Sequence, residues 1–325
     1  MPRWQRRLAN VVSGGILGGG YLATTAPQCA RSAPEDGRWA WCAGLSNADS
    51  DPAQSERIVA SVREEARQRG LEITVGLTLQ DYHAKVPPEL ALPTYGRRCT
   101  LAILLGSTRT IWPPFLAHLL KAPQLVEDEA HDGPLNAFVV RAAEEIVAKC
   151  VPSTVRCELF YAHEMEKGRL VAVQHAAHVA GVAFFHQKAG LCIHPCFGPW
   201  HSYRALLVLD VEGVPSAGPP LDPCLNTTEV AQSEEALKVA LAATADPLAT
   251  NSKLELQGSY KDAWRLWQRV RQSFVVGSEY QYEDVQDEYH YSWSKEALRR
   301  MLVEASGEKE GDKSTRQKSA GASFM

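Results

Sequence analysis

The sequence predicts a globular domain in which helices and strands alternate along a chain of 325 residues. Its 45% hydrophobic content can fill a sizeable core, which excludes a chain that is disordered throughout. Residues 51–70 repeat apolar side chains at helical spacing and end on Gly70, a residue typical of helix C-termini. Short apolar runs at 71–79 and 99–106 are typical of strands. Helix and strand patterns therefore follow each other from the start of the domain.

Later segments continue this alternation. Helices are expected at 136–150, 171–185, 233–245 and 260–275, and strands at 154–161, 190–195 and 203–210. Prolines mark loops around 87–93 and 215–223. An acidic stretch at 121–133 is expected to be a solvated surface loop without chemistry.

The two ends of the chain differ in composition from its centre. Residues 1–50 are expected to be a poorly ordered extension and a candidate targeting segment, because arginines but no acidic residue precede Glu35. A secretory signal and a disordered tail are the alternatives. Residues 303–325 are polar and are expected to form a disordered tail. The folded domain is therefore expected at 51–302.

Charge and cysteine usage exclude several classes of protein. The net charge of -4, without a basic patch in the body of the chain, argues against a nucleic-acid partner. Eight scattered cysteines lack the dense framework of small secreted domains and favour a reducing compartment. No uninterrupted apolar run reaches about 18 residues, so we expect no membrane-spanning helix. We expect a cytoplasmic protein, with a mitochondrial location as the alternative that the N-terminus suggests.

The segment from residue 171 to 204 carries the most chemistry. On a helix over 171–185, Gln174, His178, Gly181 and Phe185 share one stripe, where a flat ligand could lie beside the glycine. The alternative is a satisfied core histidine next to a packing glycine, which residue statistics favour.

A metal site in this segment is the weaker interpretation. Cys192, His194 and Cys196 would share one face of an extended strand that continued through Pro195. Thiolates and imidazoles suit zinc, but this spacing is not that of a usual zinc knuckle. We therefore predict no metal ligands.

Two arginines are candidate anion-binding residues. Arg204 lies in an apolar strand, and such a cation needs an anionic partner from the protein or from a ligand. Arg271 shares one face of the helix at 260–275 with the aromatic residues Tyr260, Trp264, Trp267 and Phe274. The alternative for that helix is ordinary amphipathic packing of its aromatic residues.

Several motifs of this segment resemble those of the cobalamin trafficking proteins of the methylmalonic aciduria and homocystinuria type C family. They are the run Gln-His-Ala-Ala-His-Val-Ala-Gly at 174–181, Cys-Ile-His-Pro at 192–195, and Phe197-Gly198 before Trp200. A weaker similarity extends from about residue 70 to 302. The resemblance implies an α+β, flavin-dependent nitroreductase-like fold with a mixed or antiparallel sheet flanked by helices, so that 51–302 would be a cobalamin-processing domain.

The resemblance also implies a function. Family members bind cobalamin with its dimethylbenzimidazole tail detached from cobalt and remove the upper axial ligand. They transfer alkyl groups to glutathione and remove cyanide reductively, with electrons from a reduced flavin (FMN or FAD) and ultimately from NADPH. The product passes to a downstream cobalamin trafficking protein. The alternative is a non-catalytic escort protein that only binds cobalamin.

The same resemblance assigns site residues. Its corrin contacts fall on Val171, Ala172, Val173, Gln174, His178, Phe185, His186, Gln187, Cys192 and Tyr203. Its glutathione-positioning arginines fall on Arg204 and Arg271, with Arg299 as a third candidate. His186 stands where the family tends to carry tyrosine and could ligate cobalt or donate to an amide, and Cys196 replaces an arginine. Asp81-Tyr82-His83 is similar to the start of a histidine-on cobalamin motif, which we interpret as coincidence.

Overall fold

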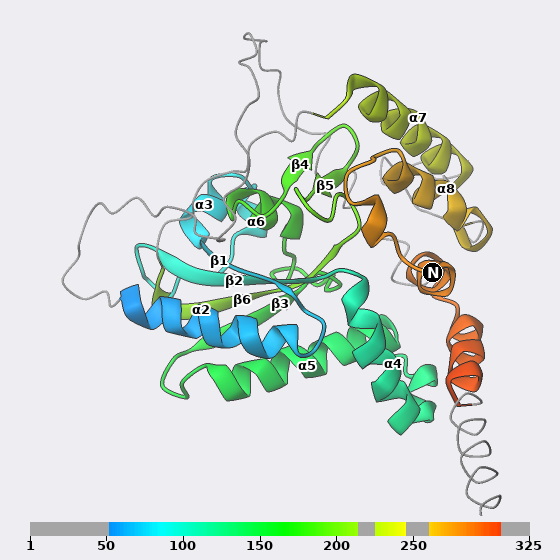
Figure 1. Ribbon diagram of the computed structural model, residues 1–325. Helices are drawn as coiled ribbons and strands as arrows, with labels where there is room; N and C mark the ends of the chain where they lie inside the picture. Colours follow the sequence, from blue (N-terminus) through cyan, green and yellow to red (C-terminus); the bar gives the residue numbers. More distant parts are fainter. Residues whose placement is uncertain (1–51, 214–224, 245–259, 307–325) are drawn as a thin grey trace, which may run out of the picture.

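A four-stranded antiparallel sheet forms the centre of the computed structural model, which describes residues 52–213, 225–244 and 260–306 (Figure 1). The strands are β1 (Ile73–Thr78), β2 (Thr100–Ser107), β3 (Cys157–Tyr161) and β6 (Ser202–Glu212), in the order β1-β2-β6-β3. Both faces of the two central strands are buried, which explains their continuous apolar sequences. The predicted extension at 1–50, the loop at 215–223 and most of the predicted tail lie outside the described residues.

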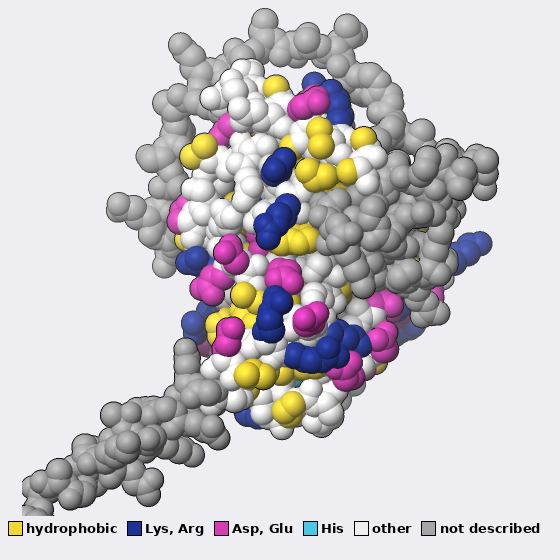
Figure 2. Space-filling model, turned by 90° about the vertical axis from the view of Figure 1, so that its right-hand side faces the viewer, with side chains coloured by type: hydrophobic (Ala, Val, Ile, Leu, Met, Phe, Trp, Pro, Cys, Tyr) yellow, Lys and Arg dark blue, Asp and Glu magenta, His cyan; other side chains and the backbone are white. Residues whose placement is uncertain are grey.

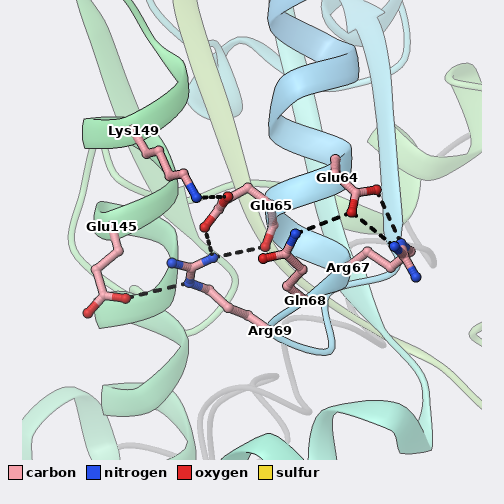
Figure 3. Close-up of polar contacts among 7 residues, drawn as sticks. All are labelled: Glu64, Glu65, Arg67, Gln68, Arg69, Glu145 and Lys149. Carbon is pink, nitrogen blue, oxygen red and sulfur yellow. Dashed lines mark hydrogen bonds and ion pairs between the residues drawn. The ribbon is translucent and has the colours of Figure 1, made fainter.

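One face of the sheet is covered by α2 (Pro52–Arg67), α4 (Trp112–Lys121) and α5 (Pro134–Cys150), which lie below the sheet in Figure 1. The predicted cap of the first helix is confirmed, because Leu71 N–H bonds Ala66 C=O and Gly70 has a φ of +75°. A charged network joins α2 to α5 (Figure 3). The buried Glu65 carboxylate pairs with Arg69 and, at 2.5 Å, with Lys149.

The opposite face is covered by two short helices, α3 (Leu79–His83) and α6 (Val173–Val179), and by a hairpin of β4 (Phe184–His186) and β5 (Leu191–Ile193) (Figure 1). Their apolar side chains form a second core with Ala102, Leu104, Leu206 and Val208 of the sheet. All motifs from 174 to 200 lie on this side of the sheet or next to it. The sheet thus separates a structural core from the candidate site.

The predicted helix at 171–185 is wrong in length, since α6 ends at Val179. Gly181 has a φ of +75°, its N–H bonds His178 C=O, and Val182 N–H bonds Ala177 C=O. These two bonds around a left-handed glycine are the Schellman arrangement that ends helices. The chain after Gly181 therefore becomes a strand, and Phe185 belongs to β4 rather than to the helix.

Three further helices flank the end of the sheet, namely α7 (Thr227–Thr244), α8 (Tyr260–Gln272) and α9 (Asp284–Ser292), followed by a helical stretch at 295–306. α7 and α8 pack against each other through Ala240 and Trp267. On the face shown in Figure 2, basic and acidic side chains are interspersed and do not form one basic area. Within the described ranges, no helix combines the length and apolar character needed to cross a bilayer.

The acidic stretch at 121–133 is more structured than predicted. It forms two 3-10 turns, η3 (Pro123–Glu127) and η4 (Ala130–Asp132). Glu127 bonds Arg299 at 2.5 Å, and Glu129 bonds Lys295 at 2.5 Å. The acidic side chains lie at the surface, as predicted, because Glu127 is 56% and Glu129 84% exposed. The two turns and the ion pairs to the last helical segment were not predicted.

Candidate functional site

The start of α6 is held in place by Tyr82 of α3. The Tyr82 hydroxyl accepts a hydrogen bond from the Ala172 N–H at 3.0 Å and donates one to Leu90 C=O at 3.2 Å. Val171, Ala172 and Val173 are half-buried and pack on the second core. Three of the predicted corrin contacts therefore form one partly exposed apolar edge with a fixed backbone.

The remaining predicted contacts of α6 reach the β4–β5 hairpin. Gln174 donates its side-chain amide to Gly190 C=O at 3.0 Å, and His178 Nδ1 accepts the Phe185 N–H at 3.3 Å. Phe185 lies opposite Cys192 in the hairpin. The structure thus brings Gln174, His178, Phe185 and Cys192 together, although they come from a helix and a hairpin instead of one helical stripe.

Three half-buried histidines lie on this hairpin or contact it, namely His175, His178 and His186. Burial lowers the pKa of both His175 and His178, so these rings are neutral near pH 7. His186 Nδ1 accepts the Ala189 N–H at 3.2 Å, which places the proton of a neutral ring on Nε2. In that tautomer Nε2 is a donor, and a cobalt bond through Nε2 would require the other tautomer. Gln187 is exposed at the hairpin turn.

Cys192 is a buried neutral thiol. Burial raises its pKa to about 12, so it is not a thiolate at neutral pH. Strand β5 ends at Ile193, before Pro195, and Cys196 is exposed while Cys192 is buried. The described residues contain no cluster of three histidine, cysteine or acidic side chains that could hold a metal ion.

His194 and His201 connect the hairpin to the sheet. His194 Nδ1 accepts the N–H groups of Cys196 and Phe197 at 3.0 and 3.1 Å. His201 Nε2 shares a hydrogen bond of 2.9 Å with the Tyr203 hydroxyl. Burial is the largest cause of the low pKa of His201, about 3, and the positive charge of Arg271 acts in the same direction. His201, which connects the hairpin to the sheet, is therefore close enough to Arg271 for its charge to affect the histidine pKa.

Arg204 occupies a β-bulge in the central strand pair. On β2, Leu105 pairs with Ala205 and Gly106 pairs with Tyr203, so Arg204 has no opposite residue there. Tyr203 consequently packs into the second core with Leu206, and the alternation of side chains shifts by one residue. Bulges redirect single side chains in this way. Tyr203 therefore lies on the hairpin side of the sheet, and Arg204 follows it at the bulge.

Arg204 and Arg271 are brought together. Arg204 donates from Nε to Ser107 Oγ at 3.1 Å, but its Nη2 is buried without a hydrogen-bond partner among the described residues. The Nη1 of Arg271 is likewise buried and has no hydrogen-bond partner among the described residues. Burial lowers the pKa of Arg204, and repulsion from Arg271 acts in the same direction. Two buried cations with unpaired donors form a site that an anion would stabilise.

The surroundings of Arg271 were not predicted from sequence. Its guanidinium carbon lies 5.8 and 5.6 Å from the ring centres of Tyr282 and Tyr291, which belong to α9 and the segment before it. The pKa of His290 lies well below its usual value because of burial and the charges of both arginines. Buried Asp287 attracts Arg271. The sequence signal for these surroundings is the run of tyrosine, histidine and acidic residues at 282–291. An exposed helix would not require so many aromatic residues.

Arg299 and His83 lie outside this arrangement. Arg299 is exposed and bonded to Glu127, so the structure does not bring it to Arg204 and Arg271. His83 Nε2 accepts the Leu92 N–H at 3.0 Å, which commits this ring to a backbone contact. The interpretation of Asp81-Tyr82-His83 as a coincidental motif is consistent with that contact.

Comparisons with known proteins give the chain a family context. The model of the methylmalonic aciduria and homocystinuria type C family matches residues 70–239. The cyanocobalamin reductase / alkylcobalamin dealkylase of Bos taurus is 31% identical over 163 residues, which cover 45% of this chain and 55% of that protein. Its Homo sapiens counterpart is 30% identical over 159 residues, covering 42% and 52%. The chain thus spans about half the length of the curated relatives it matches.

A solved structure shares the fold. The C. elegans B12-trafficking protein CblC superposes with a TM-score of 0.56 at 18% identity, covering 77% of this chain and 97% of CblC. The predicted α+β fold, nitroreductase-like with an antiparallel sheet flanked by helices, is confirmed.

Proposed function

Because the chain belongs to the methylmalonic aciduria and homocystinuria type C family, we propose that it binds cobalamin and removes its upper axial ligand. The observation that carries the catalytic part is the pair of buried, unpaired guanidinium nitrogens on Arg204 and Arg271. Protein interiors rarely leave such donors unpaired, so the pair supports binding of an anionic substrate. We propose that this substrate is glutathione.

The residues at α6 and the hairpin fit the chemistry of a corrin. Val171, Ala172 and Val173 offer a half-buried apolar edge for the ring system. The rim of a corrin carries amide side chains, for which His178 presents an Nε2–H donor. We propose that His186 is a further contact. We propose that this surface holds cobalamin with the benzimidazole tail detached from cobalt, which eases departure of the upper ligand. Gln174, Phe185, Gln187, Cys192 and Tyr203 complete the proposed contact set.

The arginine pair would hold the thiol substrate for dealkylation. A guanidinium can grip a carboxylate with two parallel hydrogen bonds, and glutathione carries two carboxylates. In the proposed reaction the glutathione sulfur takes the alkyl group, its proton is released, and the bonding electron pair stays with cobalt. The work of the two arginines is to orient the thiol beside the bound substrate.

The reductive branch of the proposal rests on the family. We propose that cyanide leaves after electrons arrive from NADPH through FMN or FAD. We further propose that the product passes to a downstream cobalamin trafficking protein. Flavin binding is tested by titrating the chain with FMN and with FAD and following the flavin fluorescence.

The decisive experiment is an anaerobic titration with methylcobalamin followed by glutathione. The wild-type chain should show the spectral change from methylcobalamin to a reduced cobalamin. Arg204→Ala should lower the glutathione-dependent rate at least tenfold and change cobalamin binding far less, because the lost partner belongs to the thiol. Arg299→Ala is the matched control, since this exposed arginine pairs with Glu127, and its rate should equal that of wild type.

Two outcomes would contradict this assignment. Equal losses of cobalamin affinity and of rate in Arg204→Ala would refute a thiol-specific role. If cobalamin binds and its spectrum never changes under anaerobic glutathione, the chain is an escort protein and not an enzyme.

A further inference from the structure

A buried carboxylate lies beside the arginine pair without a salt bridge. Asp287, on α9, has no exposed surface. Its Oδ2 accepts the side-chain amide of Gln268, whereas its Oδ1 is buried and has no hydrogen-bond partner among the described residues. Asp287 attracts Arg271, yet the described residues include no cation that forms an ion pair with it. A buried carboxylate in this state lacks the partner that would offset its loss of hydration.

The three unpaired atoms belong to one electrostatic group. Asp287 bonds Gln268 of α8, and Arg271 lies three residues further along the same helix. The charge of Arg271 acts on both Arg204 and Asp287. Arg204 Nη2 and Arg271 Nη1 are unpaired donors, and Asp287 Oδ1 is an unpaired acceptor. A simple anion satisfies only the two donors. A ligand that also carries a positive donor would satisfy all three atoms.

We propose that Asp287 binds the ammonium group of the thiol substrate, so that the site selects thiols that carry an amino-acid zwitterion. This inference rests on the proposed function, in which the two arginines bind the carboxylates of that thiol. A charged ammonium is favoured over a neutral donor because charge-assisted hydrogen bonds are about twice as strong as neutral ones. Asp287 is thereby a specificity-determining residue, and simple thiols without an amino group are poor substrates.

Two tyrosine hydroxyls near Arg271 are further unpaired acceptors within the described ranges. Tyr291 and Tyr282 flank Arg271, and their hydroxyl groups are buried without partners among the described residues. These hydroxyls can accept hydrogen bonds from an ammonium. The two tyrosines thus add neutral acceptors on α9 and just before it, next to the guanidinium of Arg271.

Calorimetric titration of the full chain with glutathione and with N-acetylglutathione tests the proposal. Acetylation removes the ammonium charge but keeps both carboxylates and the thiol. Wild type should bind glutathione about ten- to a hundredfold more tightly, the range that one charged hydrogen bond supports. Asp287→Asn should reduce glutathione affinity to that of the acetylated thiol. Asp284→Asn, an exposed position on the same helix, is the matched control and should keep the preference.

Each result decides the matter. Equal wild-type affinities for the two thiols would overturn the role of Asp287 and leave the arginine site standing, and this comparison needs no variant. A preference that persists in a folded Asp287→Asn protein would overturn it as well. No binding of either thiol would overturn both this inference and the proposed thiol site.

Discussion

Adding one methyl group at Gly198 is expected to destabilise the fold by about 3 kcal/mol. Gly198 has a φ of +53°, and a Cβ built there would overlap the backbone carbonyl of Val276. From the other side, a Cβ on Gly277 would overlap the backbone of Phe197. The turn after β5 and the turn after α8 therefore touch backbone to backbone, and only glycine fits at the contact.

The magnitude follows from three contributions. A left-handed backbone destabilises an alanine by roughly 1–2 kcal/mol. Because alanine also lowers the conformational entropy of the unfolded chain, about 0.4–1 kcal/mol of that loss is offset. Overlap with a backbone carbonyl cannot be relieved by a rotamer change, and the forced shift costs about 1–3 kcal/mol more. Gly168→Ala is the matched control, because its φ is +83° but nothing lies within 4 Å of the added Cβ. That variant should lose under about 1 kcal/mol.

Urea denaturation followed by circular dichroism measures both losses. The turn at 276–277 follows α8, so a shift at Gly198 should also move Arg271 and lower the glutathione-dependent rate, whereas Gly168→Ala should keep it. Equal losses of unfolding free energy in the two variants would refute the close-approach argument. A large loss of stability with an unchanged rate would show that the contact does not position Arg271.

Two other perturbations are informative. Tyr82→Phe leaves the Ala172 N–H without its acceptor, so cobalamin affinity should fall about tenfold in a spectroscopic titration, while Tyr95→Phe should leave it unchanged. Acidification from pH 7 to 5 should destabilise the fold, because burial lowers the pKa of His194 to about 4 and of His201 to about 3. The unfolded chain, with histidine pKa values near 6.5, then binds more protons than the folded chain, at a cost of about 2 kcal/mol per histidine at pH 5. Urea titrations at both pH values should show a pH dependence of the unfolding free energy that is about 2 kcal/mol smaller in His201→Gln than in wild type. An unchanged dependence would contradict the reasoning.

Local patterns were sufficient for the first helix and the four strands of the sheet, but they did not predict α4, β4 or α9. Helical spacing and the Gly70 cap predicted α2, and the apolar runs predicted β1 and β2, because these signals depend only on neighbouring residues. Gly181 could have corrected the helix at 171–185, since a glycine between apolar residues is a common helix end. The apolar period continues past Gly181, so periodicity alone does not mark the end of α6.

The sequence by itself determined the family motifs, the sheet strands and the identity of Arg204 and Arg271 as candidate anion-binding residues. The tertiary structure decided which of these side chains meet. A β-bulge leaves Arg204 without a partner on β2, and packing of α9 on α8 brings Asp287 to Gln268 on the helix of Arg271. Both outcomes depend on strand register and on contacts between residues far apart in the chain, which periodicity within a short window does not contain.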